Sequence, residues 1–128
     1  MAEIQFVGSD IAVAVHERQL AEHGGLSGTK DFGLLESAMS RPINKHSYGE
    51  NDLCALAAAY AFGIARNHPF NDGNKRTAWV IARLFLRLND VTIAFGKTEA
   101  IETVLALAAG DLPEDALADW FRARIVRG

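Results

Sequence analysis

A run of polar and charged residues, RNHPFNDGNKRT, interrupts a mostly apolar stretch of the chain between Arg66 and Thr77. His68 stands near the carboxylate of Asp72, and a glycine and two cations follow. An imidazole exchanges protons near neutral pH, so His68 can take a proton from a hydroxyl nucleophile. Asp72 is a candidate ligand for Mg²⁺, which often binds one carboxylate together with phosphate oxygens.

The residues after Asp72 have the composition of an anion-binding helix start. If a helix begins near Asn74, the first backbone N–H groups have no acceptors within the helix. Gly73 leaves room for an approaching phosphate, and Lys75 and Arg76 add cationic donors. The segment therefore predicts a site for a metal-bound nucleotide.

Each of these residues also has a purely structural explanation. A histidine before a proline can simply end a helix, and GNKRT can be an ordinary helix start with solvated cations. The combination favours chemistry, because a base, a carboxylate, a glycine, an amide and two cations fall within the nine residues 68–76.

Helices are predicted on both sides of this segment. Residues 51–67 are apolar almost all round, which is typical of a central buried helix, and residues 74–90 have apolar residues at helical spacing. Further helices are predicted over 9–23, from 31 to a point before Pro42, over 98–110 and from 111 onward. The plausible strands, 43–50 and 91–95, are too short for a sheet of consequence. We expect a single all-α domain, residues 1–128, built as a bundle of about six helices.

Composition limits the function classes. The net charge is −3 and the pI about 5.8, so no electrostatic pattern for direct nucleic-acid binding is present. Cys54 alone cannot form an internal disulfide, and no run of 18 apolar residues or signal peptide is apparent. We expect a cytoplasmic protein with no membrane segment.

HPFNDGNKRT resembles the signature H-x-F-x-[D/E]-[G/A]-N-[G/K]-R of the Fic/Doc superfamily, and Lys75 resembles its Doc (death-on-curing) branch. Residues 22–42 and 84–91 agree with that branch, so the resemblance covers nearly the whole chain. It implies a Fic/Doc-like helical fold with a short flap segment.

The resemblance also implies residue roles. His68 corresponds to the general base that acts on a target hydroxyl, and Asp72 to the Mg²⁺ ligand. The residues similar to the family's phosphate and ATP ligands are Gly73, Asn74, Lys75 and Arg76, and Phe70 and Asn71 support the motif. The segment 41–50 is similar in place to a target-docking flap, with Lys45, His46 and Tyr48 as candidates, although a plain surface loop also explains it.

For the Doc branch, the implied activity is transfer of the γ-phosphate of Mg-ATP to a threonine of elongation factor Tu. The protein would then be the toxin of a type II toxin–antitoxin system. Its inhibitor would be a Phd-like antitoxin whose C-terminal segment folds as a helix into an apolar groove. Lys75, and Trp79 in place of a second arginine, favour phosphate transfer.

Two alternatives stay open. HPF and Gly73 resemble the AMP-adding members, so AMP transfer is one alternative, and a catalytically silent antitoxin-binding module is the other. The segment from Thr98 to Glu102 matches an inhibitory-helix pattern only in part, so we expect inhibition from outside the chain.

Two further histidines lie on one predicted helix. His16 and His23 share a face, but no third ligand stands at metal spacing, so both are predicted to be solvated.

Overall fold

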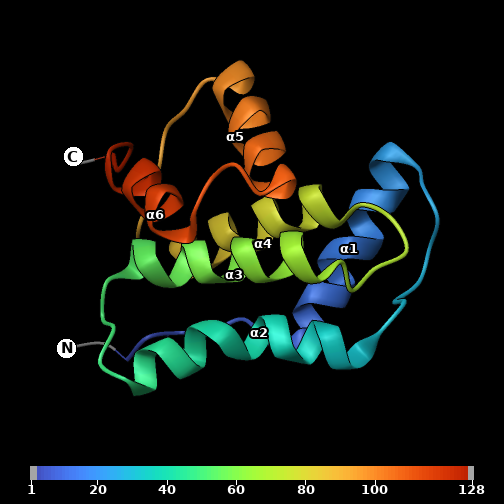
Figure 1. Cartoon of the computed structure of the whole chain (residues 1–128), viewed down its shortest axis with the longest axis horizontal. Helices are drawn as coiled ribbons and strands as arrows, with labels where there is room; N and C mark the ends of the chain where they lie inside the picture. The colour runs from blue at the N-terminus through green and yellow to red at the C-terminus, as the bar shows by residue number, and fades with distance from the viewer. Residues whose placement is uncertain (1–2, 127–128) are drawn as a thin grey trace.

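The computed structural model describes residues 3–126, which form six α-helices (Figure 1). They are α1 Ser9–His23, α2 Phe32–Ser47, α3 Leu53–Asn67, α4 Asn74–Leu88, α5 Lys97–Ala109 and α6 Glu114–Arg122. Within residues 3–126 the β-pairing is limited to two isolated bridges, Thr29 with Phe70 and Ile93 with Ile125. The predicted all-α bundle is therefore confirmed. None of the helices in this part of the chain is long and apolar enough to cross a membrane.

Helix α3 is the centre of the bundle, with α2 on one side and α4, α5 and α6 around the rest (Figure 1). Its buried residues are mostly alanines, and small side chains let neighbouring helices approach closely. A Cβ atom added at Gly63 would lie 3.1 Å from the Cα of Ala38 in α2. The Ala- and Gly-rich composition of α3 thus sets the distance between α2 and α3.

Helix α2 continues through Pro42, so the prediction that it ends before this proline is wrong. A proline cannot donate the usual hydrogen bond to the residue one turn earlier, and it disfavours a helix. Here Pro42 is buried, and the residues on either side of it, Arg41 and Lys45, both donate to the Glu114 carboxylate of α6. These tertiary contacts stabilise the second half of α2, so residues 43–47 are helical and not a strand or loop.

An aromatic cluster joins α4 to the C-terminal part of the chain. The Trp79 ring lies 5.5 Å from Phe95, 5.3 Å from Trp120 and 5.6 Å from Phe121, measured between ring centroids. Only 9% of Trp79 is exposed. Position 79 therefore points into the core between α4 and α6.

Asp52 connects the start of α3 to α6. Its carboxylate accepts a hydrogen bond from the backbone N–H of Cys54 and another from the Arg122 guanidinium. Partial burial by itself would raise the pKa of the Asp52 carboxyl, but these two hydrogen bonds and the charge of Arg122 outweigh it and lower that pKa. Asp52 therefore contributes to stability as a carboxylate.

We expect Asp52→Ala to lower the free energy of unfolding at pH 7 by about 1 kcal/mol, the usual effect of losing a helix N-cap. Because the folded-state pKa is lowered, the charged contribution is complete above about pH 4 and is lost as the pH falls through the folded-state value. Urea unfolding between pH 7 and pH 3 should show that the free energies of unfolding of wild type and Asp52→Ala become more alike as the pH falls. A difference that stays constant with pH would contradict this explanation.

Candidate active site

The polar segment 68–73 forms the loop between α3 and α4, and two residues with left-handed backbone conformation determine its path. His68 ends α3 with φ 50° and ψ 56°, and its N–H donates to the carbonyl of Ile64. Gly73, with φ 75°, precedes Asn74, where α4 begins as predicted. A left-handed conformation is uncommon for a residue with a Cβ, so the surroundings must hold His68 in it.

The interior of the loop is fastened by Phe70 and Asn74. Phe70 is 1% exposed. The Asn74 side chain accepts from the Phe70 N–H and donates to the Phe70 carbonyl, both at 3.0 Å. Asn74 was predicted as a phosphate ligand, but its side chain is used within the loop and is only 8% exposed. What it can offer to an anion is its backbone N–H at the start of α4.

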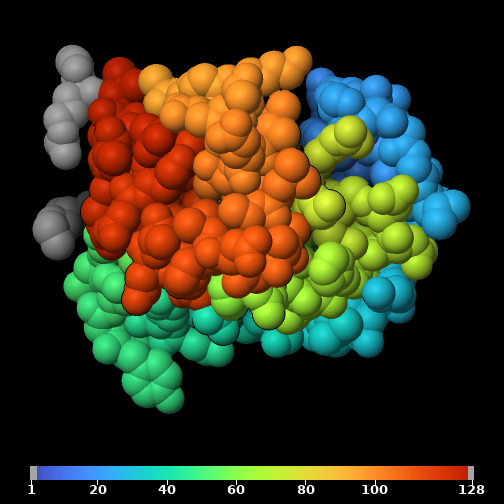
Figure 2. Space-filling model, turned by 45° about the horizontal axis from the view of Figure 1, so that its top comes forward, coloured from blue at the N-terminus to red at the C-terminus, as the bar shows by residue number. Residues whose placement is uncertain are grey.

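A cavity of about 420 Å³ opens over this loop. Its lining brings together most of the residues predicted from the sequence, namely His68, Asn71, Asp72, Gly73, Asn74, Lys75 and Arg76. In the space-filling view, the yellow-green surface of this region lies between the blue of α1 and the orange of α5 (Figure 2). A base, a carboxylate, two cations and a helix N-terminus therefore face one solvent-open space.

The carboxylate of Asp72 is held by two backbone N–H groups. Oδ1 accepts from Gly73 at 2.8 Å, and Oδ2 accepts from Leu26 at 3.3 Å. Each oxygen keeps a further lone pair for another partner. Among residues 3–126, no group of three or more His, Cys, Asp or Glu side chains is placed to hold a metal ion. Asp72 therefore fits a cation that takes its other ligands from phosphate and water, and not one held by protein alone.

The segment between α1 and α2 covers the loop. The Asn71 side chain donates to the Ser27 carbonyl, its N–H donates to Gly28, and the Lys30 N–H donates to Pro69. No motif in the sequence signalled this pairing. The segment over the loop is thus residues 24–31, whereas the flap was predicted at 41–50.

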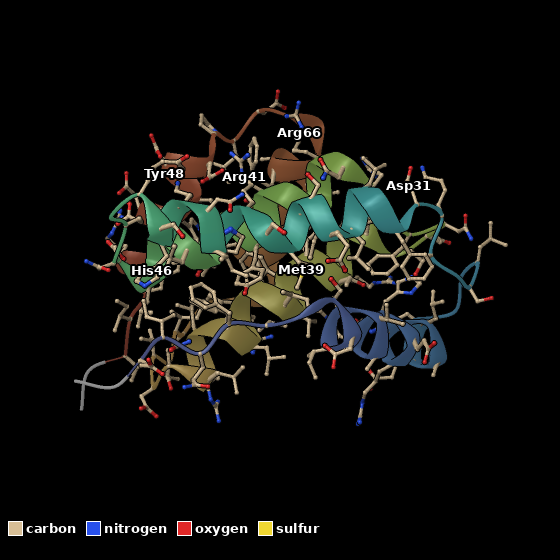
Figure 3. The ribbon with its side chains drawn as sticks, turned by 90° about the horizontal axis from the view of Figure 1, so that it is seen from below. Asp31, Met39, Arg41, His46, Tyr48 and Arg66 are labelled. Atoms are coloured by element: carbon tan, nitrogen blue, oxygen red, sulfur yellow. The ribbon has the colours of Figure 1, made fainter. Side chains whose placement is uncertain are left out.

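The predicted flap residues lie elsewhere. Figure 3 shows Asp31 at one end of α2 and His46 and Tyr48 at the other. The end at Asp31 is near the loop, because the Asp31 N–H donates to the Pro69 carbonyl at 3.1 Å, as the Lys30 N–H also does. Lys45 is paired with Glu114, the His46 ring bonds to the Glu50 carbonyl, and Tyr48 is 93% exposed. The structure does not bring these side chains to His68, and a docking role for them stays a prediction.

His16 is a site residue that the sequence analysis missed. It was predicted to be solvated, but it is 1% exposed, and its Nε2 lies 2.7 Å from the carbonyl oxygen of Asp72. The prediction for His23 holds, because that residue is exposed at the end of α1. Ala12, His16 and Leu20 follow one another at helical spacing, so this stripe could have placed His16 on the inner face of α1.

A helical bundle whose two central helices hold a histidine, a carboxylate and a helix start around one cavity has the architecture of a group-transfer enzyme. The chain belongs to the Fic/DOC family, whose family model matches residues 6–86. The relative named Protein kinase doc from Escherichia phage P1 is 34% identical over 120 residues, covering 93% of this chain and 94% of the relative. Toxin Doc from Mycolicibacterium smegmatis is 39% identical over 100 residues, covering 74% and 76%. The predicted membership is confirmed.

We expect Asn74→Ala to lower the free energy of unfolding by about 1–3 kcal/mol, because it leaves the buried N–H and C=O of Phe70 without partners. Thermal and urea unfolding would measure the loss. Asn44→Ala is a suitable control, since Asn44 lies exposed on α2, and a change within about 0.5 kcal/mol is expected. Equal stability of Asn74→Ala and wild type would show that the two hydrogen bonds do not fasten the loop.

Proposed function

We propose that this protein is a toxin of a type II toxin–antitoxin system that transfers the γ-phosphate of ATP to a hydroxyl of a target protein. The target we propose is a threonine of translation elongation factor Tu, whose modification arrests translation. The observation that carries the proposal is the convergence of His68, Asp72 and the N-terminus of α4 on one cavity. The names of the two relatives, a protein kinase and a toxin, support the same activity.

The reaction assigns a task to each group. His68 takes the proton of the target hydroxyl as its oxygen attacks the γ-phosphorus. The bond from that phosphorus to the bridging oxygen of the β-phosphate breaks, and ADP leaves. Charge on the transferred group is spread over its peripheral oxygens, so positioned N–H groups and cations are the main catalytic requirement. In this proposal the charge is stabilised by Lys75, Arg76 and the first N–H groups of α4.

Asp72 would hold Mg²⁺ in this reaction, and the ion would neutralise charge on the phosphates. The carboxylate fits this task because it lines the cavity and each of its oxygens accepts one backbone N–H at 2.8 or 3.3 Å.

The orientation of ATP separates phosphate transfer from AMP transfer. Lys75 is exposed and lines the cavity. In the AMP-adding orientation its side chain would compete with the inner phosphates for this space. Trp79, which stands where AMP-adding proteins have a second arginine, is enclosed by Phe95, Trp120 and Phe121. Position 79 therefore supplies no cation for a distal phosphate, and this observation supports γ-phosphate transfer.

A toxin of this kind requires an inhibitor, and we propose a Phd-like antitoxin whose C-terminal segment folds as a helix on this protein. The name of the relative Toxin Doc supports such a partner. A silent module that only binds an antitoxin would have no use for the open cavity around His68 and Asp72.

The first test uses elongation factor Tu and ATP labelled at either the α- or the γ-phosphate. We expect label to move to the target only from the γ position, and His68→Ala to lower the rate by about 10²–10⁴-fold, the range for loss of a general base. Expression of wild type, but not of His68→Ala, should arrest growth.

The outcomes separate the alternatives. Transfer of α-label would establish AMP addition and contradict the kinase assignment. Equal transfer by wild type and His68→Ala would remove the general-base role. Growth arrest that depends on His68 without labelling of elongation factor Tu would show that the target is a different protein.

A second test concerns Lys75. We expect Lys75→Ala to lower γ-phosphate transfer by about 10–100-fold, the range for a lost hydrogen bond to a charged group, mainly by weakening ATP binding. The matched control is Lys97→Ala, an exposed lysine in the first turn of α5, which should transfer phosphate at the wild-type rate. Steady-state kinetics with varied ATP would measure both. An unchanged KM and kcat for Lys75→Ala would exclude a phosphate contact by this side chain.

A further inference from the structure

The contact between His16 and Asp72 joins α1 to the candidate active-site loop. The imidazole is 1% exposed, and its Nε2 lies 2.7 Å from the Asp72 carbonyl oxygen. A carbonyl oxygen can only accept a hydrogen bond, so Nε2 must carry the proton. The contact is therefore a directed hydrogen bond from α1 to the backbone of the loop.

This hydrogen bond fixes the orientation of one peptide group. In a planar trans peptide, the C=O of one residue and the N–H of the next point in opposite directions. When the Asp72 carbonyl points to His16, the N–H of Gly73 must point away from α1. That N–H contacts Asp72 Oδ1 at 2.8 Å, and both residues line the cavity.

The backbone preferences of Gly73 by themselves do not select this orientation. Gly73 has φ 75°, and glycine adopts positive and negative φ with similar ease. Rotation of the peptide between Asp72 and Gly73 would therefore meet little steric resistance. A rotated peptide would take the Gly73 N–H away from Asp72 Oδ1 and would place a carbonyl oxygen, with its partial negative charge, beside the anion-binding start of α4.

Further contacts hold His16 and Asp72 in place. The His16 ring stacks on Phe70 with centroids 3.9 Å apart and planes within 6°, and Asn74 fastens the Phe70 backbone in turn. On the other side, a Cβ added at Gly25 would lie 2.8 Å from Asp72 Oδ2. Helix α1 and the turn after it thus contact both the carbonyl and the carboxylate of Asp72.

We propose that His16 is a positioning residue that locks the peptide between Asp72 and Gly73, so that the Gly73 N–H donates to Asp72 Oδ1 and holds the carboxylate at the cavity where the phosphates of the nucleotide would bind. The inference rests on the proposed function for the identity of the ligand. His16 acts through the backbone of Asp72 and touches neither ATP nor the target.

The wild-type protein offers the first test. Nitrogen-15 NMR of the histidine rings should show a protonated Nε2 at His16, protected from exchange with solvent, without any nucleotide present. An unprotonated Nε2 would overturn the proposal, and this measurement does not depend on a variant that must fold.

Two variants separate the hydrogen bond from the packing. His16→Phe keeps an aromatic ring against Phe70 but loses the donor, whereas His16→Gln keeps an N–H donor near the Nε2 position and loses the ring. We expect His16→Phe to shift the Gly73 amide resonance and to weaken binding of Mg²⁺ with a non-hydrolysable ATP analogue about tenfold, as for one lost hydrogen bond. His16→Gln should restore most of the binding even if its melting temperature is lower. His23→Phe, an exposed histidine on the same helix, should match wild type.

The outcomes distinguish this inference from the proposed function. If folded His16→Phe binds the analogue as wild type does and its Gly73 amide is unchanged, His16 only fills space and the inference is wrong. If His16→Gln binds no better than His16→Phe, ring packing and not the donor is responsible, which also overturns it. If wild type binds no Mg-ATP analogue, the proposed function fails, while the protonation of Nε2 and the shift of the Gly73 amide in His16→Phe still decide whether the lock exists.

Discussion

The close packing of α2 and α4 against α3 is the constraint on which the candidate site depends. Alanines and Gly63 let the α2 backbone approach α3 so closely that an added Cβ at Gly63 would lie 3.1 Å from Ala38. With both central helices held by the core, the chain between them must reverse direction within the short segment 68–73. The left-handed conformations of His68 and Gly73 are the local consequence, and they direct the cavity residues outward.

The loop divides its polar residues between two tasks. Asn74, Asn71 and the missed His16 make hydrogen bonds to backbone groups, which fastens the loop from α4, from the covering segment 24–31 and from α1. His68, Lys75 and Arg76 are exposed around the cavity. A buried polar group that is fully hydrogen-bonded gives a rigid and specific geometry. The hydrogen-bonded residues therefore hold the exposed cavity residues in a defined arrangement. The net charge of the whole chain is −3, whereas Lys75 and Arg76 place two positive charges together at the start of α4.

Much of the fold and of the site could be predicted from the sequence because those features depend on local chemistry. The helical periodicity of α3 and α4, the start of α4 at Asn74 and the cavity around His68 and Asp72 follow from residues close together in the chain. Features that depend on contacts between distant residues were not predicted. Pro42 lies within a helix because Arg41 and Lys45 bind Glu114 of α6, and the segment covering the loop is 24–31 because Asn71 pairs with Ser27 and Gly28.

The sequence by itself determined the helical class, the family and the set of groups available for chemistry, because periodicity and a short motif are properties of neighbouring residues. Only the tertiary structure decided how these groups are used. It bonds the Asn74 side chain to the Phe70 backbone, encloses Trp79 in an aromatic cluster, and buries His16 against Asp72. The physical reason is that a side chain's role depends on which partners lie within hydrogen-bonding or packing distance, and for these residues the deciding partners come from other helices and loops.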